Sequence, residues 1–339
     1  MGPRLRGDDV FRRSIARLDH VNLGRCGLKI SRLTLGAMGF GDPAWRSWVL
    51  QEEASRAIIK RALDRGINAI DTCDYYSGGR SEEIVGQAIK DFVRREEIVL
   101  ATKVGMPMGK GPNARGFSRK HIIEAAEQSL KRLQVDHIDL YQTHVWDPGT
   151  NLEEMMQAFH DLVRAGKVRY IGITDMPFWQ FATAHLHALH NGLTPFTSVQ
   201  NHYNLIWRED ERELFPFCRA QGIGLIPYSP MARGYLCDRI RGTERVKSDD
   251  HAQKIYGRPS DKAVAEAVEA VAKELGVAPA QVALAWVLSR PGVHSPIFGA
   301  TRPEHVDAAV AALEIKLGDE QSRRLEAAYV PRPMAGHGL

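Results

Sequence analysis

From about residue 33 onwards, the chain alternates short apolar runs with longer segments of helical periodicity. Segments 53–66, 118–133, 151–166 and 262–276 repeat apolar residues at three- and four-residue spacing, and several end at glycine, which predicts amphipathic helices. Eight runs rich in β-branched and aromatic residues predict strands: LTLG (33–36), INAID (67–71), IVLATK (98–103), IDLYQTH (138–144), RYIGIT (169–174), FTSVQ (196–200), IGLIPYS (223–229) and SPIFGA (295–300).

Eight strands, each followed by a helix, predict a (β/α)8 TIM barrel within the α/β class. A doubly wound sheet is the main alternative, but no G-x-G-x-x-G follows the first strand. The runs at 20–24 and 27–31 predict an N-terminal β-hairpin that closes the bottom of the barrel. We expect one domain over 17–330, a flexible tail over 1–16 and a C-terminal tail over 331–339.

A long segment without clear periodicity, residues 229–261, follows the seventh predicted strand. Loops of this length inside a compact domain are more often functional than incidental. We therefore expect this segment to lie over a binding site.

The composition of the chain argues against several classes of protein, including nucleic-acid-binding, membrane-spanning and disulfide-rich proteins. The 339 residues are 44% hydrophobic and 25% charged, and the net charge of +4 is spread along the chain, which argues against nucleic acid as a partner. We see no apolar run long enough to span a membrane. The four cysteines are far apart, without a C-x-x-C pair, so we expect no disulfide framework, no metal site and a cytoplasmic location. The oligomeric state stays open.

Ionisable residues gather at the carboxyl ends of three successive predicted strands. Asp71, Lys103 and His144 hold these positions, and Tyr75 and Tyr76 follow Asp71 in the next loop. Each has an ordinary explanation, since a lysine can be solvated, a histidine can be a satisfied polar residue and an aspartate can cap a helix. Together they predict a site, because the carboxyl ends of barrel strands converge on one face.

A lysine ammonium beside a phenol favours the phenolate and lowers the pKa of the tyrosine, and a carboxylate keeps that lysine charged. The sequence thus predicts a tyrosine that works as an acid near neutral pH. The chemistry does not choose between Tyr75 and Tyr76.

Several motifs in order resemble the aldo-keto reductase superfamily from about Leu23 to about Ala309. They are LGRCGLKISRLTLGAMGFG, GINAIDTCDYYSGGRSEEIVGQAI, ATKVG, LYQTHVWDP, GKVRYIGIT, VQNHYNL, IPYSPMARG and PIFGA. Within the superfamily the chain is most similar to the bacterial branch of 1-deoxyxylulose-5-phosphate reductase-like and aryl-alcohol dehydrogenase-like proteins.

The resemblance implies reversible, NADPH-dependent hydride transfer to an aldehyde or ketone, with NADH as a weaker cofactor. By the family's spacing, five positions after Asp71, Tyr76 is the expected general acid and base. Lys103 and Asp71 would tune it, and His144 would orient the carbonyl oxygen.

The cofactor residues also follow from the resemblance. Tyr228 would stack on the nicotinamide, Ser229 would cradle the pyrophosphate, Gln200 would bind the carboxamide and Arg302 the 2′-phosphate. The full expected set is Gly36, Met38, Thr174, Asp175, Gln200, Tyr228, Ser229, Met231, Gly234, Gly299, Thr301, Arg302 and His305.

The chain departs from the family at two cofactor segments. Thr174 and Asp175 replace the usual Ser-Asn or Ser-Ser, and a carboxylate cannot donate to the carboxamide oxygen. Near the C-terminus, His305 stands where Gln or Arg is usual, and Ala308 and Ala309 replace a Glu-Asn pair. Fewer adenosine contacts are expected.

Four tryptophans lie in or near segments expected at the barrel mouth: Trp45, Trp48, Trp146 and Trp207. They fit a pocket for aromatic carbonyl compounds, although packing of loops onto the barrel explains each of them equally well.

Two other functions remain open. A binding protein similar to the potassium-channel β-subunits would share the motifs, with slow or vestigial reductase activity. A lyase or isomerase using Lys103 as a Schiff base would leave Tyr76 and His144 unexplained.

Overall fold

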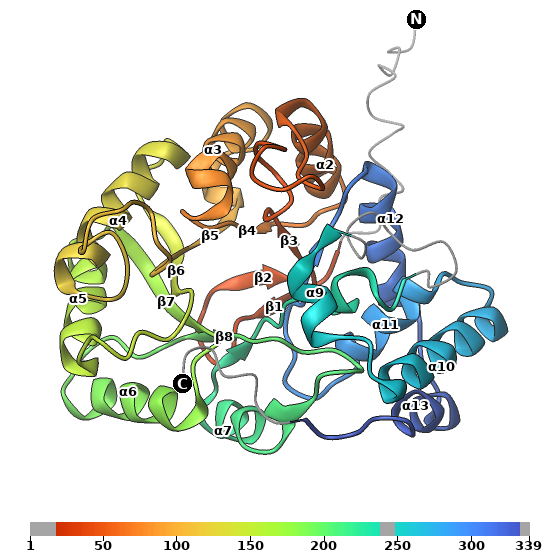
Figure 1. The fold of residues 1–339 in the computed structure, drawn as a ribbon. Helices are drawn as coiled ribbons and strands as arrows, with labels where there is room; N and C mark the ends of the chain where they lie inside the picture. Colours follow the sequence, from red (N-terminus) through yellow and green to blue (C-terminus); the bar gives the residue numbers. More distant parts are fainter. Residues whose placement is uncertain (1–17, 238–247, 333–339) are drawn as a thin grey trace, which may run out of the picture.

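The computed structural model describes residues 18–237 and 248–332, so the expected N-terminal tail over 1–16 lies outside the described residues, as does all but the first two residues of the expected C-terminal tail over 331–339. Eight parallel strands surround one axis, with helices outside them (Figure 1). Every neighbouring pair within this sheet is parallel. The strands are β3 (Thr34–Gly36), β4 (Ala69–Asp71), β5 (Val99–Val104), β6 (Ile138–Thr143), β7 (Val168–Thr174), β8 (Ser198–Gln200), β9 (Gly224–Leu225) and β10 (Ile297–Gly299).

The sheet closes on itself where the segment around β9 meets β10. Leu225 bridges to Val293 and Tyr228 to Ile297, both in parallel. The backbone N–H of Ile297 donates to the Pro227 carbonyl at 2.8 Å. A doubly wound sheet would reverse its strand order and keep open edges, so the closed, sequential order confirms the (β/α)8 barrel.

The helices form where apolar spacing and capping residues agree. All four predicted helical segments are confirmed. Asn151 accepts hydrogen bonds from two backbone N–H groups at the start of α5, and Gly276 ends α10 in the left-handed region at φ 67°. The helices are α2 (Glu52–Asp64), α3 (Arg80–Phe92), α4 (Arg119–Leu133), α5 (Leu152–Arg164), α6 (Phe178–His190), α7 (Leu214–Gln221), α9 (Asp250–Ile255), α10 (Pro259–Leu275), α11 (Pro279–Leu288), α12 (Pro303–Ala311) and α13 (Asp319–Glu326).

None of the helices in the described ranges is by itself long and apolar enough to cross a membrane; α10 and α11 reach that length and composition only as a pair bent by 100°.

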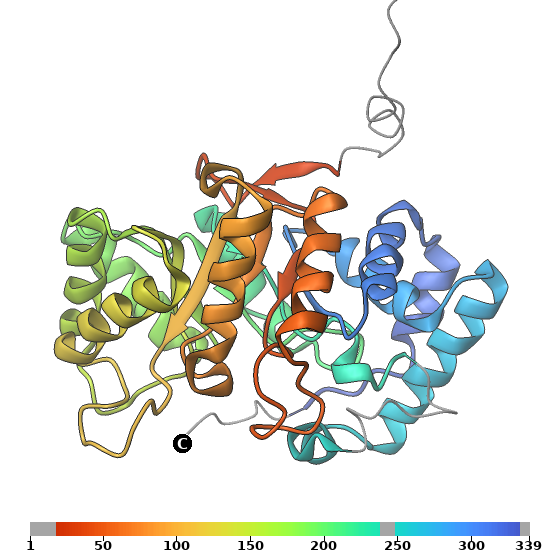
Figure 2. The same ribbon diagram turned by 90° about the horizontal axis from the view of Figure 1, so that it is seen from above.

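The predicted hairpin is confirmed. β1 (His20–Asn22) and β2 (Lys29–Ser31) pair in antiparallel fashion at one end of the barrel, opposite α9 (Figure 2). Its buried side chains Leu23 and Ile30 pack against residues from the strands and fill that end with an apolar layer that includes Ala69, Val99, Ala101, Leu140 and Ile226. Polar residues inside the barrel are therefore expected at the other end, where the strands have their carboxyl ends.

Of the long segment expected over 229–261, residues 238–247 lie outside the described residues, and the described part includes the short helix α9. Arg233 at its start forms an ion pair with Asp249 at 2.8 Å, and both side chains are at least nine-tenths buried. The Tyr256 hydroxyl lies 2.6 Å from His202 Nε2, just beyond β8. The ion pair joins two parts of the segment to each other, and the Tyr256–His202 contact fastens it to the carboxyl end of the barrel, on the side where the sequence predicts the site.

Candidate active site

Four predicted residues meet at the carboxyl ends of three adjacent strands. Asp71 is the last residue of β4, Lys103 is the penultimate residue of β5, and His144 directly follows β6. Tyr76 begins the short 3-10 turn η1 (Tyr76–Gly79) after β4. Because β4, β5 and β6 are hydrogen-bonded neighbours, these side chains share one end of the barrel.

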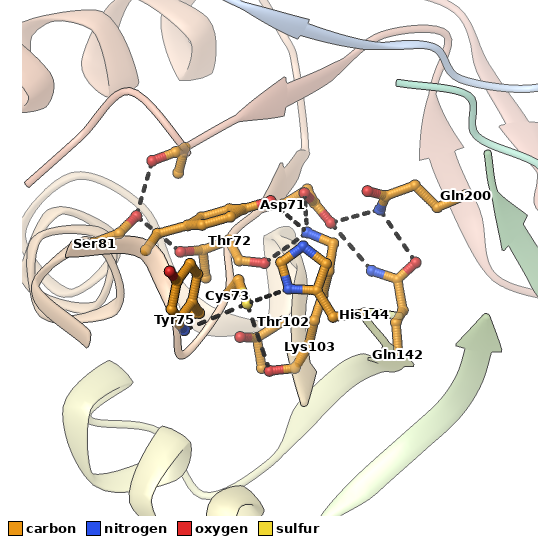
Figure 3. Close-up of polar contacts among 12 residues, drawn as sticks. Asp71, Thr72, Cys73, Tyr75, Ser81, Thr102, Lys103, Gln142, His144 and Gln200 are labelled. Carbon is orange, nitrogen blue, oxygen red and sulfur yellow. Dashed lines mark hydrogen bonds and ion pairs between the residues drawn. The ribbon is translucent and has the colours of Figure 1, made fainter. Parts of the chain in front are cut away.

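Lys103 links the carboxylate to the phenol. Its Nζ donates to Asp71 Oδ2 at 2.5 Å, to the Thr72 carbonyl at 2.9 Å and to the Tyr76 hydroxyl at 3.3 Å (Figure 3). Lys103 is fully buried, and Asp71 and Tyr76 are 3% and 7% exposed. An ammonium buried with these three acceptors is paired and cannot reorient freely.

The two tyrosines have different surroundings. Tyr76 is the one whose hydroxyl meets Lys103, and its ring lies 5.6 Å from the His144 ring at 85°. Tyr75 is half-buried, and its ring packs edge-on against Trp45 at 5.8 Å. The geometry thus distinguishes two residues that chemistry alone could not separate.

Small residues shape the turn that carries Tyr76. Ser77, Gly78 and Gly79 all adopt positive φ angles, of 50°, 61° and 97°. The φ angle of Gly79 favours glycine, and a Cβ at this position would also lie 2.6 Å from Arg132 Cδ, so the arginine side chain would have to shift. Ser81 Oγ donates to the Ala37 carbonyl at 2.8 Å and fastens the turn to the segment after β3.

Two glutamines complete the surroundings of Asp71. Gln142 Nε2 donates to Asp71 Oδ1 at 3.1 Å, and Gln200 Nε2 donates to the same oxygen at 2.8 Å (Figure 3). Sequence analysis missed Gln142, although it shares the inward parity of His144 on β6. For Gln200 we expected carboxamide binding, whereas its amide N–H group contacts the Asp71 carboxylate.

Burial and neighbouring charges shift the pKa values of Lys103 and Tyr76. Burial opposes the Lys103 ammonium, but Asp71 and the hydroxyl of Tyr76 outweigh it and raise the pKa of Lys103 above its usual value. Burial raises the pKa of Tyr76 above its usual value, against a lowering by Lys103. The expected lowering from the lysine is therefore present but smaller than the burial effect, so the phenol keeps its proton at neutral pH.

His144 has a neighbour that sequence analysis did not anticipate. Its Nδ1 lies 2.9 Å from the Sγ of Cys73, a buried residue two positions after Asp71 (Figure 3). Cys73 Sγ also contacts Asp74 Oδ1 at 3.2 Å. The Cys73 thiol, between the end of β4 and the turn η1, thus contacts one of the two ring nitrogens of His144.

Comparison with known proteins decides the family. The model of the aldo/keto reductase family matches residues 32–330. The chain belongs to this family. It is accordingly an oxidoreductase that acts on carbonyl compounds or alcohols, in a family that generally uses NAD(P)H.

The aldo/keto reductase relatives that it resembles include fungal enzymes. It is 41% identical over 338 residues to versiconal hemiacetal acetate reductase of Aspergillus parasiticus, covering 93% of this chain and 98% of that protein. It is 40% identical over 341 residues to a protein of Schizosaccharomyces pombe named as a candidate aryl-alcohol dehydrogenase, covering 93% and 96%. An aldo-keto reductase of Fusarium vanettenii is 38% identical over 352 residues, covering 96% and 94%.

The expected nicotinamide segments of this aldo/keto reductase lie beside the four residues. Thr174 ends β7, in register with Gln200 on β8, and its Oγ1 is buried without a hydrogen-bond partner in the described structure. Asn201, which sequence analysis missed, has a buried Oδ1 in the same condition, while its Nδ2 donates to Asp210 at 2.6 Å. A buried hydroxyl at the end of β7 and a buried amide oxygen just after the neighbouring β8 fit a ligand that both donates and accepts, such as an amide.

Tyr228 and Asp175 form a pair across neighbouring loops. The Tyr228 hydroxyl donates to Asp175 Oδ2 at 2.8 Å, and its ring stacks on His202 at 5.2 Å and 16°. Asp175 and Ser229 adopt positive φ angles of 45° and 55°. Non-glycine residues in this region are strained, and such strain is common where a loop is shaped for a ligand.

The remaining expected cofactor residues lie at β3, β10 and the segments that follow. Gly36 pairs with Gly299, and a Cβ at position 36 would lie 2.9 Å from Ile297 Cγ2, which gives this glycine a packing reason. Met231 packs against the core, and Gly234 ends the turn η4 (Ala232–Gly234) at φ 98°. Met38 is half-buried just beyond β3.

Arg302 lies at the N-cap of α12. Its side chain is 68% exposed, and the ion pair to Glu304 is long, at 3.9 Å. His305 Nδ1 accepts from the Thr301 backbone N–H at 3.3 Å. The backbone of Arg302 thus lies at the positive end of a helix, and its side chain is exposed to solvent.

The four expected pocket tryptophans divide into separate groups. Trp45 packs against Tyr76 at 6.4 Å and against Trp48 at 6.5 Å, and Arg46 lies over its ring at 4.3 Å. Trp207 stacks on His202 at 5.1 Å. Trp146 is partly buried against the core between strands and helices. Trp45 is therefore the tryptophan nearest to the four-residue cluster by these contacts.

Proposed function

We propose that this aldo/keto reductase is an NADPH-dependent carbonyl reductase in which Tyr76 is the general acid, and the general base when the alcohol is oxidised. The observation that carries the proposal is the buried Lys103 ammonium, 2.5 Å from Asp71 and 3.3 Å from the Tyr76 hydroxyl. Bound NADPH supplies the hydride that reduces the carbonyl carbon.

Tyr76 gives its proton to the carbonyl oxygen as negative charge develops there. Its phenol is protonated at neutral pH, as a donor must be. Lys103 stabilises the phenolate that remains, and Asp71 holds Lys103 charged and oriented. His144 donates a hydrogen bond to the carbonyl oxygen, which orients the substrate and stabilises the developing charge.

Residues next to this cluster would hold the cofactor. Thr174 Oγ1 can donate to the carboxamide oxygen, and Asn201 Oδ1 can accept from its NH2 group, which supplies the donor that Asp175 lacks. Tyr228 provides a ring face, and Ser229 begins the segment that would follow the pyrophosphate. Arg302, Thr301 and His305 would take the adenosine end, with Gly299 beside them.

The substrate we propose is an aromatic aldehyde, ketone or alcohol. Trp45 and Tyr75 place an aromatic wall beside Tyr76. The relatives' names, a versiconal hemiacetal acetate reductase and a candidate aryl-alcohol dehydrogenase, point to the same class. Cys26, Cys73, Cys218 and Cys237 are not joined in disulfides, in line with the cytoplasmic location that we propose, and residues 17–330 would form the single catalytic domain.

A screen of purified protein tests the function. NADPH or NADH is offered with a panel of aromatic and aliphatic carbonyl compounds, and NADP⁺ or NAD⁺ with the matching alcohols, while cofactor absorbance is followed. We expect NADPH oxidation that depends on the carbonyl and is fastest with aromatic members. Tight NADPH binding without turnover of any member would contradict the proposal and favour a binding protein.

A further inference from the structure

Cys73 contacts the imidazole that would face the substrate, and its thiol is fully buried. It follows Asp71 by two residues at the end of β4, so the strand that positions Asp71 also positions this sulfur. Its Sγ lies 2.9 Å from His144 Nδ1 and accepts from the Tyr75 backbone N–H at 3.4 Å. The proposed reaction, as described above, leaves this thiol without a role.

The hydrogen on Nδ1 decides what the rest of the ring can do. A neutral imidazole carries one N–H. If Nδ1 accepts a hydrogen bond from its partner, the ring proton is on Nε2; if Nδ1 carries the proton and donates it, Nε2 can only accept. Only the form with the proton on Nε2 can donate from Nε2 to a carbonyl oxygen. With Cys73 Sγ 2.9 Å from Nδ1, the role that we propose for a neutral His144 in reduction therefore requires that the sulfur donate this hydrogen bond and Nδ1 accept it.

The Cys73 thiol can be this donor. Burial and the nearby Asp74 carboxylate raise the pKa of the Cys73 thiol well above its usual value, so the sulfur keeps its proton. Three acceptors lie within reach of that proton: His144 Nδ1 at 2.9 Å, Asp74 Oδ1 at 3.2 Å and the Lys103 carbonyl at 3.9 Å. The imidazole nitrogen is the nearest of them.

Asp74 is a weaker competitor than an ordinary carboxylate. Burial, with a further contribution from Glu82, raises the pKa of Asp74 to about 7. A carboxyl group that is partly protonated at neutral pH is a weaker acceptor for the thiol hydrogen than a full carboxylate. Nδ1 of His144, which is also nearer, is then the favoured acceptor.

We propose that Cys73 is a positioning residue for His144, whose thiol donates to Nδ1 and holds the imidazole in the tautomer with its proton on Nε2. This inference rests on the proposed carbonyl reduction for its kinetic consequence. The tautomer itself is a property of the protein without substrate and can be observed separately.

Nitrogen-15 NMR of histidine-labelled protein observes the tautomer directly. The His144 resonances are assigned by their loss in His144→Gln, and the parent is compared with Cys73→Ala and Cys73→Ser at neutral pH. We expect the proton on Nε2 in the parent, a shift towards a mixture of tautomers in Cys73→Ala, and recovery in Cys73→Ser, because a hydroxyl can also donate. Cys218→Ala, which removes another buried thiol from α7, should leave the His144 signals unchanged.

Kinetics give the second readout. Loss of one neutral hydrogen bond should lower kcat for carbonyl reduction in Cys73→Ala by about three- to tenfold, with little change in NADPH affinity. In a His144→Gln background the same substitution should cause no further loss, since Cys73 acts through the imidazole. Cys73→Ser should restore most of kcat.

The two readouts separate the possible failures. A parent with its proton on Nδ1, or a tautomer that does not change in Cys73→Ala, overturns the role of Cys73 whatever the activity. A parent that shows the expected tautomer and its loss in Cys73→Ala, yet reduces no carbonyl compound, supports the role of the thiol and contradicts the proposed function instead.

Discussion

Gln200 and Asp71 are 129 positions apart in the chain, yet the Gln200 amide donates to Asp71 Oδ1 at 2.8 Å and links β8 to β4 inside the barrel. Gln142 donates to the same oxygen from β6. With Lys103 on Oδ2, the buried carboxylate is held from three other strands. The carboxylate that orients Lys103 thus depends on residues outside the predicted catalytic set.

We expect Gln200→Leu to lower kcat more than it weakens NADPH binding. The substitution removes a hydrogen bond to a charged group, which contributes about 1.5 to 3 kcal/mol, or roughly ten- to a hundredfold in kcat. Gln142→Leu is the matched control, because it removes the other bond to the same oxygen and should act alike. If Gln200→Leu mainly weakens NADPH binding while Gln142→Leu does not, Gln200 serves the carboxamide and not Asp71.

Lys103→Met should be about as damaging as Tyr76→Phe, and the double variant should be little worse. Both substitutions disable one unit, the proton donor and the ammonium that stabilises its phenolate, so their losses are not additive. Single-turnover rates of the parent and the three variants test this directly. Losses that multiply in the double variant would reject a coupled pair.

Arg302 should select NADPH over NADH. Its exposed guanidinium at the start of α12 can bind the 2′-phosphate with charge-assisted hydrogen bonds, so Arg302→Ala should weaken NADPH binding about tenfold and barely change NADH binding. Titration of cofactor fluorescence measures both affinities. Arg323→Ala, an exposed arginine on α13, is the control and should change neither. Equal losses for the two cofactors in Arg302→Ala would contradict the assignment.

His185 should make the fold sensitive to mild acid. It is 1% exposed on α6, neither ring nitrogen has a partner in the described structure, and burial, with a smaller effect of Arg25, lowers the pKa of His185 to about 4. Between pH 6.5 and about 4, the unfolded chain then binds more protons, so the free energy of unfolding decreases as the pH falls.

Urea denaturation of His185→Leu as a function of pH checks this. The variant should lose less stability than the parent between pH 6.5 and 4, while His190→Leu, a matched change at an exposed position of α6, should follow the parent. Parallel pH profiles for the parent and His185→Leu would show that His185 is not the group responsible.

Periodicity and strand ends predicted most of the fold and the position of the site. The eight strands, the four helical segments and the hairpin follow from local pattern, and Asp71, Lys103 and His144 from their places at strand ends. The predicted strand at 223–229 was too long, since β9 is Gly224–Leu225 and the chain beyond it joins β10 by a single bridge at Tyr228. The six-residue α9 was missed because it is too short to show a helical period.

The rest of the site depends on long-range contacts. Gln142, Cys73 and Asn201 are ordinary residues in the sequence. Only the folded barrel brings Gln142 to Asp71 and Cys73 to His144, and places Asn201 just after β8, next to the strand that ends at Thr174. The net effect of burial on the pKa of Tyr76 has the same origin, because the sequence indicates the neighbouring lysine but not the exclusion of water. The choice between Tyr75 and Tyr76 needed either the family spacing or the structure.

The central claim is that the Tyr76 phenol, placed by Lys103, is the proton donor, and substitution of each tyrosine by phenylalanine tests it most directly. The two variants are matched, since each removes one hydroxyl from adjacent positions. We expect Tyr76→Phe to lower kcat for carbonyl reduction by about a hundred- to ten-thousandfold with NADPH affinity nearly unchanged, and Tyr75→Phe to retain most activity. A Tyr76→Phe variant that still reduces carbonyl compounds, or a Tyr75→Phe variant that does not, would contradict the account.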